Sequence, residues 1–185
     1  MISANDLRRG ATFEMDGELY KVVEYQHSFI GRGSANVRVK MRNLRTGTLT
    51  DRTFSPNDRI NDVRLELRGV QYLYNDGTLY YFMDTETYEQ PALSVEILGD
   101  ALDYLTENMT LQISTYEGEP IDIVLPVTVD LKVIEAAPGF AGDTATGATK
   151  QVTLETGLKV TVPLFVEEGD IIRVDTRTGE YIARL

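Results

Sequence analysis

The feature that most constrains this chain is an alternation of apolar and polar residues that recurs along nearly its whole length. Clear examples are residues 18–25, 35–41, 110–116 and 157–162, and turn signals such as Asp16-Gly17 and Thr178-Gly179 separate such segments. Alternation with a period of two places every second side chain on one face of a β-strand. The sequence therefore predicts an all-β fold of short strands arranged as barrels or sandwiches.

Helical periodicity is confined to residues 94–108, and Gly99 is expected to divide even that segment into short pieces. A chain of 185 residues can form one sizeable core or two or three small barrels in series. It has no long apolar run, and its first six residues lack the basic and apolar parts of a signal peptide. We therefore expect a cytoplasmic protein with no membrane segment.

The side chains that most enzymes use are scarce. Cysteine is absent and His27 is the single histidine. The chain therefore lacks thiolates, and it has too few histidines for an ordinary zinc site or for most nucleophiles that a histidine activates. We interpret His27 as a surface or hydrogen-bonded strand residue. Pairs such as Glu167-Glu168 fall in turn-like positions. The sequence predicts no enzyme, cofactor or metal, and a hydrolase that uses only carboxylates is the remaining enzymatic alternative.

Charge is spread unevenly over a chain whose net charge is −11. Residues 1–64 carry a balance of +3, residues 65–126 a balance of −11 with Arg68 as their single cation, and residues 127–185 a balance of −3. No acidic residue lies between Glu24 and Asp51. The cations in that interval fit either a solvated strand face or a surface that binds polyanions; they are Arg32, Arg38, Lys40, Arg42 and Arg45.

A weak internal repeat and the charge steps predict three domains: residues 1–64, 65–126 and 127–185. The repeat has a spacing of 37 residues and matches Ile121, Ile123, Pro126 and Val129 with Leu158, Val160, Pro163 and Val166. Neither junction is rich in glycine or serine, so we expect short and stiff connections.

Two glycine-rich loops are the candidate functional segments. In residues 29–35, Gly31 and Gly33 flank Arg32, which a hairpin tip projects as an isolated guanidinium suited to phosphates or sugars. In residues 138–147, backbone N–H groups near Gly142, with Asp143 and Thr144, can hydrogen-bond RNA bases or sugars. The alternatives are an ordinary glycine turn and a plain surface loop.

Several motifs in order give an end-to-end resemblance to bacterial elongation factor P. They include the opening residues 1–10, the Gly-Arg-Gly tip, and Asn43 through Gly47. Residues 71–74 and 82–88 continue the match, followed by Gly142-Asp143-Thr144, residues 150–163 and Gly169, and by residues 175–181.

The resemblance implies a fold and a function. The fold is an elongated, L-shaped mimic of tRNA, with an SH3-like (KOW-like) barrel over 1–64 and OB-type barrels over 65–126 and 127–185. Members of the family bind the 70S ribosome beside the P-site peptidyl-tRNA and relieve stalling at consecutive prolines. We expect a monomer without cofactor. The alternative is a paralogous OB/SH3 adaptor that binds another RNA or protein.

Site roles follow from the same resemblance. Gly31, Arg32 and Gly33 are expected at the acceptor end of the tRNA. Separately, the acid-free interval predicts that the basic residues Arg38, Lys40 and Arg42 contact the RNA backbone. The segment Gly142-Asp143-Thr144 is expected at the mRNA codon in the exit site.

The surroundings of Arg32 predict that it functions without modification. An arginine excludes the lysine modification that many family members carry. The rhamnosylated branch has a tip resembling Ser-Gly-Arg-Asn-Ser, whereas here Ile30 precedes Gly31 and Gly33 replaces the asparagine. Mass spectrometry of protein from its native source should find no added mass on the peptide that carries Arg32. A hexose-sized addition there would contradict the prediction.

Overall fold

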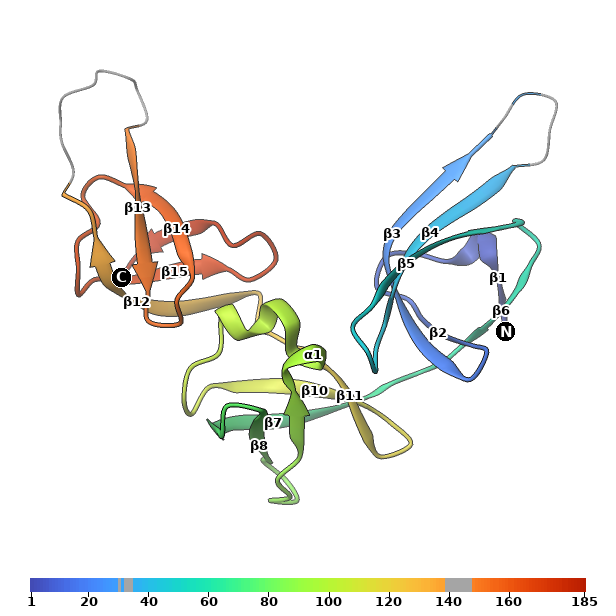
Figure 1. Cartoon of the computed structure of the whole chain (residues 1–185), viewed down its shortest axis with the longest axis horizontal. Helices are drawn as coiled ribbons and strands as arrows, with labels where there is room; N and C mark the ends of the chain where they lie inside the picture. The colour runs from blue at the N-terminus through green and yellow to red at the C-terminus, as the bar shows by residue number, and fades with distance from the viewer. Residues whose placement is uncertain (30, 32–34, 139–147) are drawn as a thin grey trace.

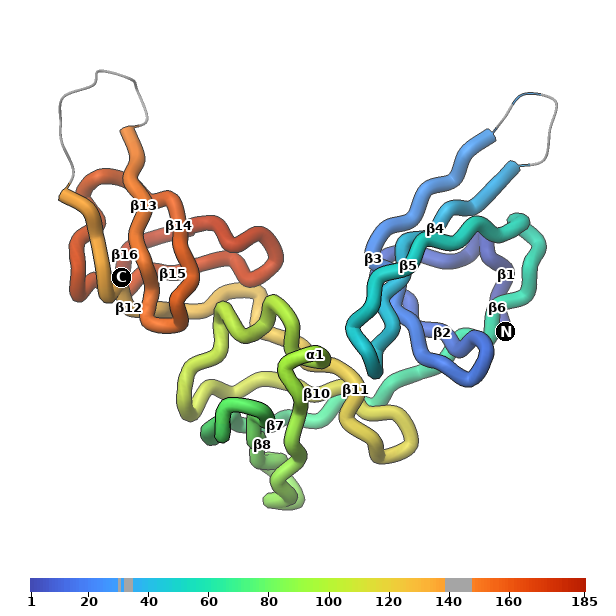
Figure 2. Tube along the Cα trace, viewed as in Figure 1, coloured from blue at the N-terminus to red at the C-terminus, as the bar shows by residue number. Residues whose placement is uncertain are grey.

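The computed structural model describes residues 1–29, 31, 35–138 and 148–185. In this part of the chain, strands form three antiparallel sheets that follow one another along the sequence (Figure 1). The first and third sheets lie on either side of the second like the two arms of a V, and the trace in Figure 2 follows the same path. The predicted all-β fold of three barrels is confirmed.

The first sheet has six strands in the order β1-β6-β2-β3-β4-β5. Phe13, Val37 and Val39 are fully buried beneath it, because alternate residues of its strands face inward. The bounds are β1 Ile2–Ser3, β2 Thr12–Met15, β3 Glu18–Ser28, β4 Asn36–Asn43, β5 Leu49–Phe54 and β6 Arg59–Asp62, with a short 3₁₀ turn at Ala4–Asp6.

The second and third sheets share one topology. Each places its first strand, β7 or β12, in the middle between its second and fourth strands, which is the strand order of OB folds. The second sheet contains β7 Glu66–Asn75, β8 Leu79–Asp84, β9 Ala92–Ser94, β10 Thr110–Tyr116 and β11 Glu119–Val124. The third contains β12 Thr128–Ala136, β13 Thr149–Leu154, β14 Lys159–Pro163, β15 Ile171–Asp175 and β16 Tyr181–Arg184.

This shared topology corrects the register of the sequence repeat. The spacing of 37 residues aligns β11, the fifth strand of its sheet, with β14, which is the third strand of its own. The matched residues are therefore not structurally equivalent. Alternating valines, isoleucines and prolines produce such matches between any two strands. The second and third sheets are similar, but the 37-residue spacing that indicated a repeat did not align their equivalent strands.

The predicted helical segment is divided at Gly99. The helix α1 covers Val95–Leu98 and a 3₁₀ turn, η2, covers Gly99–Asp103. Gly99 has a φ of +50°, in a region that side chains disfavour, so the regular helix ends there. The short helix contacts both β9 and β11 and buries Leu98 in the core. It thus covers the seam between the two edge strands of the second sheet.

The connections between the sheets are short. The first sheet ends at Asp62 and the second begins at Glu66; the second ends at Val124 and the third begins at Thr128. Each of the predicted ranges 1–64, 65–126 and 127–185 thus contains one sheet. Within the described residues, no helix is long and apolar enough to cross a membrane.

The core of the third sheet depends on its central strand. Leu131→Ala should remove about 2–5 kcal/mol from the free energy of unfolding, because Leu131 is fully buried on β12. Hydrogen exchange should rise across β12–β16 and stay unchanged in the first sheet. Leu185→Ala, at a side chain that is 61% exposed, is the control and should change stability by less than about 0.5 kcal/mol. Equal losses in both variants would contradict this assignment.

Candidate RNA-binding surfaces

The strands that flank the Gly-Arg-Gly segment form a long ribbon. β3 and β4 pair in register as far as Ser28 and Asn36, and Figure 1 shows them extending beyond the rest of their sheet. Gly31 has a φ of +45°, as expected for a glycine in a turn. Arg32 and Gly33 lie outside the described residues, so their role at the tRNA acceptor end stays a prediction.

The predicted backbone-contacting residues lie on one face of β4. Arg38, Lys40 and Arg42 alternate with buried residues of the core. Arg38 lies 3.8 Å from Asp51 and Lys40 lies 3.9 Å from Glu24, both pairs being largely exposed. Exposed ion pairs contribute at most about 1 kcal/mol. These two cations can therefore exchange their carboxylate partners for phosphates at little cost.

Arg42 has a different environment. Its guanidinium donates hydrogen bonds to the carbonyl oxygens of Ile97, at 2.8 Å, and Glu96, at 3.4 Å. Both carbonyls belong to α1 of the second domain. Arg42 thus joins the first domain to the second, a task that the sequence did not indicate, and its contact with the RNA backbone stays a prediction. Sequence reasoning missed this contact because the partners are 54 and 55 residues away.

Further contacts fix the first domain against the second. The Lys21 ammonium lies 3.1 Å from the carboxylate of Asp122, a side chain that is nearly buried. Beside this pair, Leu19, Leu44 and Ile121 form a buried apolar cluster. The ion pair fixes the direction of contact, and the apolar cluster beside it buries surface from both domains. This joint sets the direction in which the β3–β4 ribbon projects.

The second and third domains share their packing. Tyr104, which follows η2 in the second domain, is buried in the core of the third sheet. Met109 and Leu125 pack against both cores. The Thr176 hydroxyl donates to the carbonyl of Pro126 at 2.6 Å. Thr176, within the segment 175–181 that carries part of the family resemblance, therefore helps to hold this junction.

The second glycine-rich loop connects β12 to β13. Ala136 ends β12 and Thr149 begins β13, whereas Gly142, Asp143 and Thr144 lie outside the described residues. The role of this loop at the mRNA thus stays a prediction. Figure 1 shows that β13 and the β3–β4 ribbon end on the same side of the V, at opposite arms.

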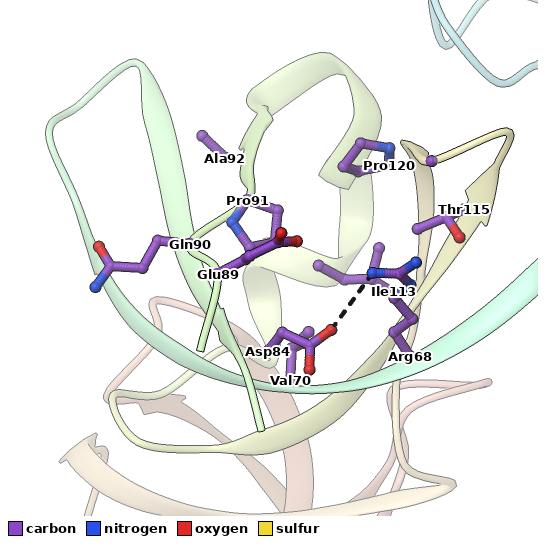
Figure 3. A pocket seen from close by; sticks show the side chains of 11 residues that line it. Arg68, Val70, Asp84, Glu89, Gln90, Pro91, Ala92, Ile113, Thr115 and Pro120 are labelled. Atoms are coloured by element: carbon purple, nitrogen blue, oxygen red, sulfur yellow. Dashed lines mark ion pairs between the residues drawn. The ribbon is translucent and has the colours of Figure 1, made fainter. Parts of the chain in front are cut away.

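A cavity of about 370 Å³ opens between the edges of β9 and β11 (Figure 3). At its mouth Arg68 lies 3.8 Å from Asp84. The backbone N–H groups of Thr87 and Glu86 donate to the Asp84 carboxylate and hold its pKa below the usual range. This carboxylate is a fixed hydrogen-bond acceptor, which does not suit a general acid. In the chain outside 30, 32–34 and 139–147, no three metal-ligating side chains cluster.

The order of the domains defines a fold class: an SH3-like (KOW-like) barrel followed by two OB-type barrels. A solved structure, "Eukaryotic translation initiation factor 5A from Methanococcus jannaschii", has a similar fold with a TM-score of 0.51 and 21% identity. It covers 67% of this chain, and the match covers 92% of that structure.

Family models match all three domains. They are described as the elongation factor P KOW-like domain at 3–60, the elongation factor P OB domain at 65–123, and elongation factor P, C-terminal, at 129–184. Elongation factor P of Moorella thermoacetica is 56% identical and that of Thermoanaerobacter sp. (strain X514) is 50% identical, each over the full length of both chains. The chain belongs to the elongation factor P family of translation elongation factors.

Gly47 of the first domain lies against α1 of the second, so a substitution there tests the joint between the two domains. A Cβ added there would lie 2.8 Å from the carbonyl oxygen of Glu96. Gly47→Ala should therefore lower the free energy of unfolding by about 1–3 kcal/mol more than Gly10→Ala, and it should raise hydrogen exchange over 95–103. Gly10 is a matched control because its φ is also positive but no atom lies within 4 Å of its added Cβ. Equal effects would show that only backbone strain matters.

Proposed function

We propose that this protein binds the 70S ribosome beside the P-site peptidyl-tRNA, on the side of the exit site, and stimulates peptide-bond formation at consecutive prolines. The observation that carries the proposal is the extended β3–β4 ribbon in a chain of this family. The ribbon carries the exposed cations Arg38 and Lys40 on a domain held by the contacts of Lys21 and Arg42, and in the sequence the Gly-Arg-Gly segment lies between its two strands.

The charge distribution supports contact with RNA at selected places. The second domain, with one cation against 12 acidic residues, repels phosphates, whereas the first domain carries a balance of +3. A ribosomal ligand with this distribution approaches RNA through the ribbon. Cytoplasmic location and a monomeric state belong to the same proposal.

The proposed mechanism is positional. Proline is a poor participant in peptide transfer because its ring fixes φ and constrains the nascent chain. Holding the acceptor end of peptidyl-tRNA in a reactive geometry lowers the entropic part of the barrier, and the ribosome carries out the chemistry. The proposal assigns no catalytic group and no cofactor to this chain.

The residues divide between four tasks. Gly31, Arg32 and Gly33 contact the tRNA acceptor end, and Arg38 and Lys40 contact the RNA backbone. Arg42 maintains the joint. The segment Gly142-Asp143-Thr144 contacts the mRNA codon in the exit site.

Synthesis of a Pro-Pro-Pro peptide on purified ribosomes tests the proposal. The native protein should restore synthesis, and Arg32→Ala should reduce the rate about 10- to 100-fold, the effect of losing a charged hydrogen bond. Arg64→Ala, which removes an exposed cation near the first junction, is the matched control and should keep the native rate.

The outcomes separate the factor assignment from the role of the tip. If Arg32→Ala matches the native protein, the elongation function stands and the role of Arg32 is wrong. If the native protein sediments with ribosomes but does not stimulate synthesis, the paralogous adaptor becomes the better assignment.

A further inference from the structure

One face of β3 carries a row of aromatic side chains that the proposed function has not used. Tyr25 and His27 lie two residues apart on β3 and point to the same side of the ribbon. Phe29 follows directly after the last strand residue, Ser28, and its ring lies against that of His27. Tyr25 is half-buried, His27 is exposed and Phe29 is 80% exposed. An aromatic row therefore leaves the core and continues into solvent.

The geometry of the row is defined at both ends. At its base, the Tyr25 hydroxyl donates to the carbonyl of Asn5 at 3.3 Å, and the Arg8 guanidinium lies 5.4 Å from the centre of the Tyr25 ring. At its outer end, the rings of His27 and Phe29 have centroids 4.6 Å apart and an angle of 34° between their planes. The two outer rings thus support each other while remaining open to solvent.

The row lies on the opposite face of the ribbon from the cations of β4. Tyr25 and His27 pair across the strands with Val39 and Val37, which belong to the buried face of β4. Arg38 and Lys40 point the other way. The ribbon therefore presents the rings on one side and Arg38 and Lys40 on the other. The cation Arg8 lies on the aromatic side, against Tyr25, and a cation beside aromatic rings is typical of surfaces that bind single-stranded nucleic acids.

We propose that His27 and Phe29 form a stacking site for an unpaired base of RNA. Under the proposed function, on which this inference rests, the base belongs to the single-stranded 3′ end of the tRNA acceptor arm. Charge favours RNA over a protein partner, because no acidic residue lies between Glu24 and Asp51. Stacking on Phe29 fixes the plane of the base, and Arg8, an exposed cation on the aromatic side, attracts the phosphate backbone.

A fluorescent reporter tests base stacking directly. The chain has no tryptophan, so full-length Phe29→Trp carries a single indole at the proposed site. An RNA hairpin with an unpaired 3′ ACCA extension should quench its fluorescence, and the same hairpin with a blunt end should not. Phe165→Trp, at an exposed position of the third domain, should respond to neither RNA.

The Pro-Pro-Pro assay measures the consequence for function. Phe29→Leu keeps an apolar side chain without the aromatic ring and should slow synthesis about tenfold, within the range found for loss of one stacked base. Phe29→Tyr should keep the native rate. Both variants should sediment with ribosomes as the native protein does, which separates a stacking role from a folding defect.

Failure of the inference is distinguishable from failure of the proposed function. If Phe29→Leu is as active as the native protein, or if the Phe29→Trp signal does not depend on the ACCA extension, the stacking site is overturned while the elongation function stands. A signal that changes only with ribosomal protein, and not with RNA, also overturns it. Quenching by the extension without any stimulation by the native protein supports the stacking site and refutes the proposed function.

Discussion

The joint between the first two domains is the constraint on which the rest of the structure depends. A ribbon that reaches away from its own core has a useful direction only if its domain is held at a fixed angle. The Lys21–Asp122 pair, the apolar cluster around Ile121, and the bonds from Arg42 to the carbonyls of α1 supply three contacts of different kinds. An ion pair, an apolar contact and hydrogen bonds differ in their geometric demands, so together they restrict both rotation and bending.

The division of charge follows from the same arrangement. Acidic residues concentrate in the central domain, where the two arms meet, and cations concentrate in the first arm. Under the proposed function this pattern favours a defined orientation, because uniform positive charge binds RNA without regard to register. The acidic central domain repels phosphates, so RNA is expected to contact the first domain instead. The charge pattern thus favours one orientation of the protein on RNA.

Local features of this chain were readable from the sequence, whereas contacts distant in sequence were not. Alternation predicted the strands, and Gly99 was correctly expected to divide the helical segment, since both depend on near neighbours. The 37-residue match failed because alternation does not identify which strand of a barrel is which. The hydrogen bonds of Arg42 to the carbonyls of Glu96 and Ile97 were not predicted, because these residues become neighbours only in the folded chain. Of the two alternatives for His27, a surface residue or a hydrogen-bonded one, the structure shows an exposed strand residue, but its contact with Phe29 needed side-chain geometry.

The burial of Tyr104 in the core of the third sheet has a consequence for how such a protein evolves and is synthesised. The third barrel is a separate unit by topology, yet part of its interior is supplied by the preceding domain. It is therefore not a free module that can be exchanged between proteins at the chain boundary. During synthesis, the third domain meets a neighbour that has already left the ribosome and presents this tyrosine. The core of the third domain is thus complete only when Tyr104 of the second domain packs into it. Completion of the third domain therefore depends on the prior folding of the second.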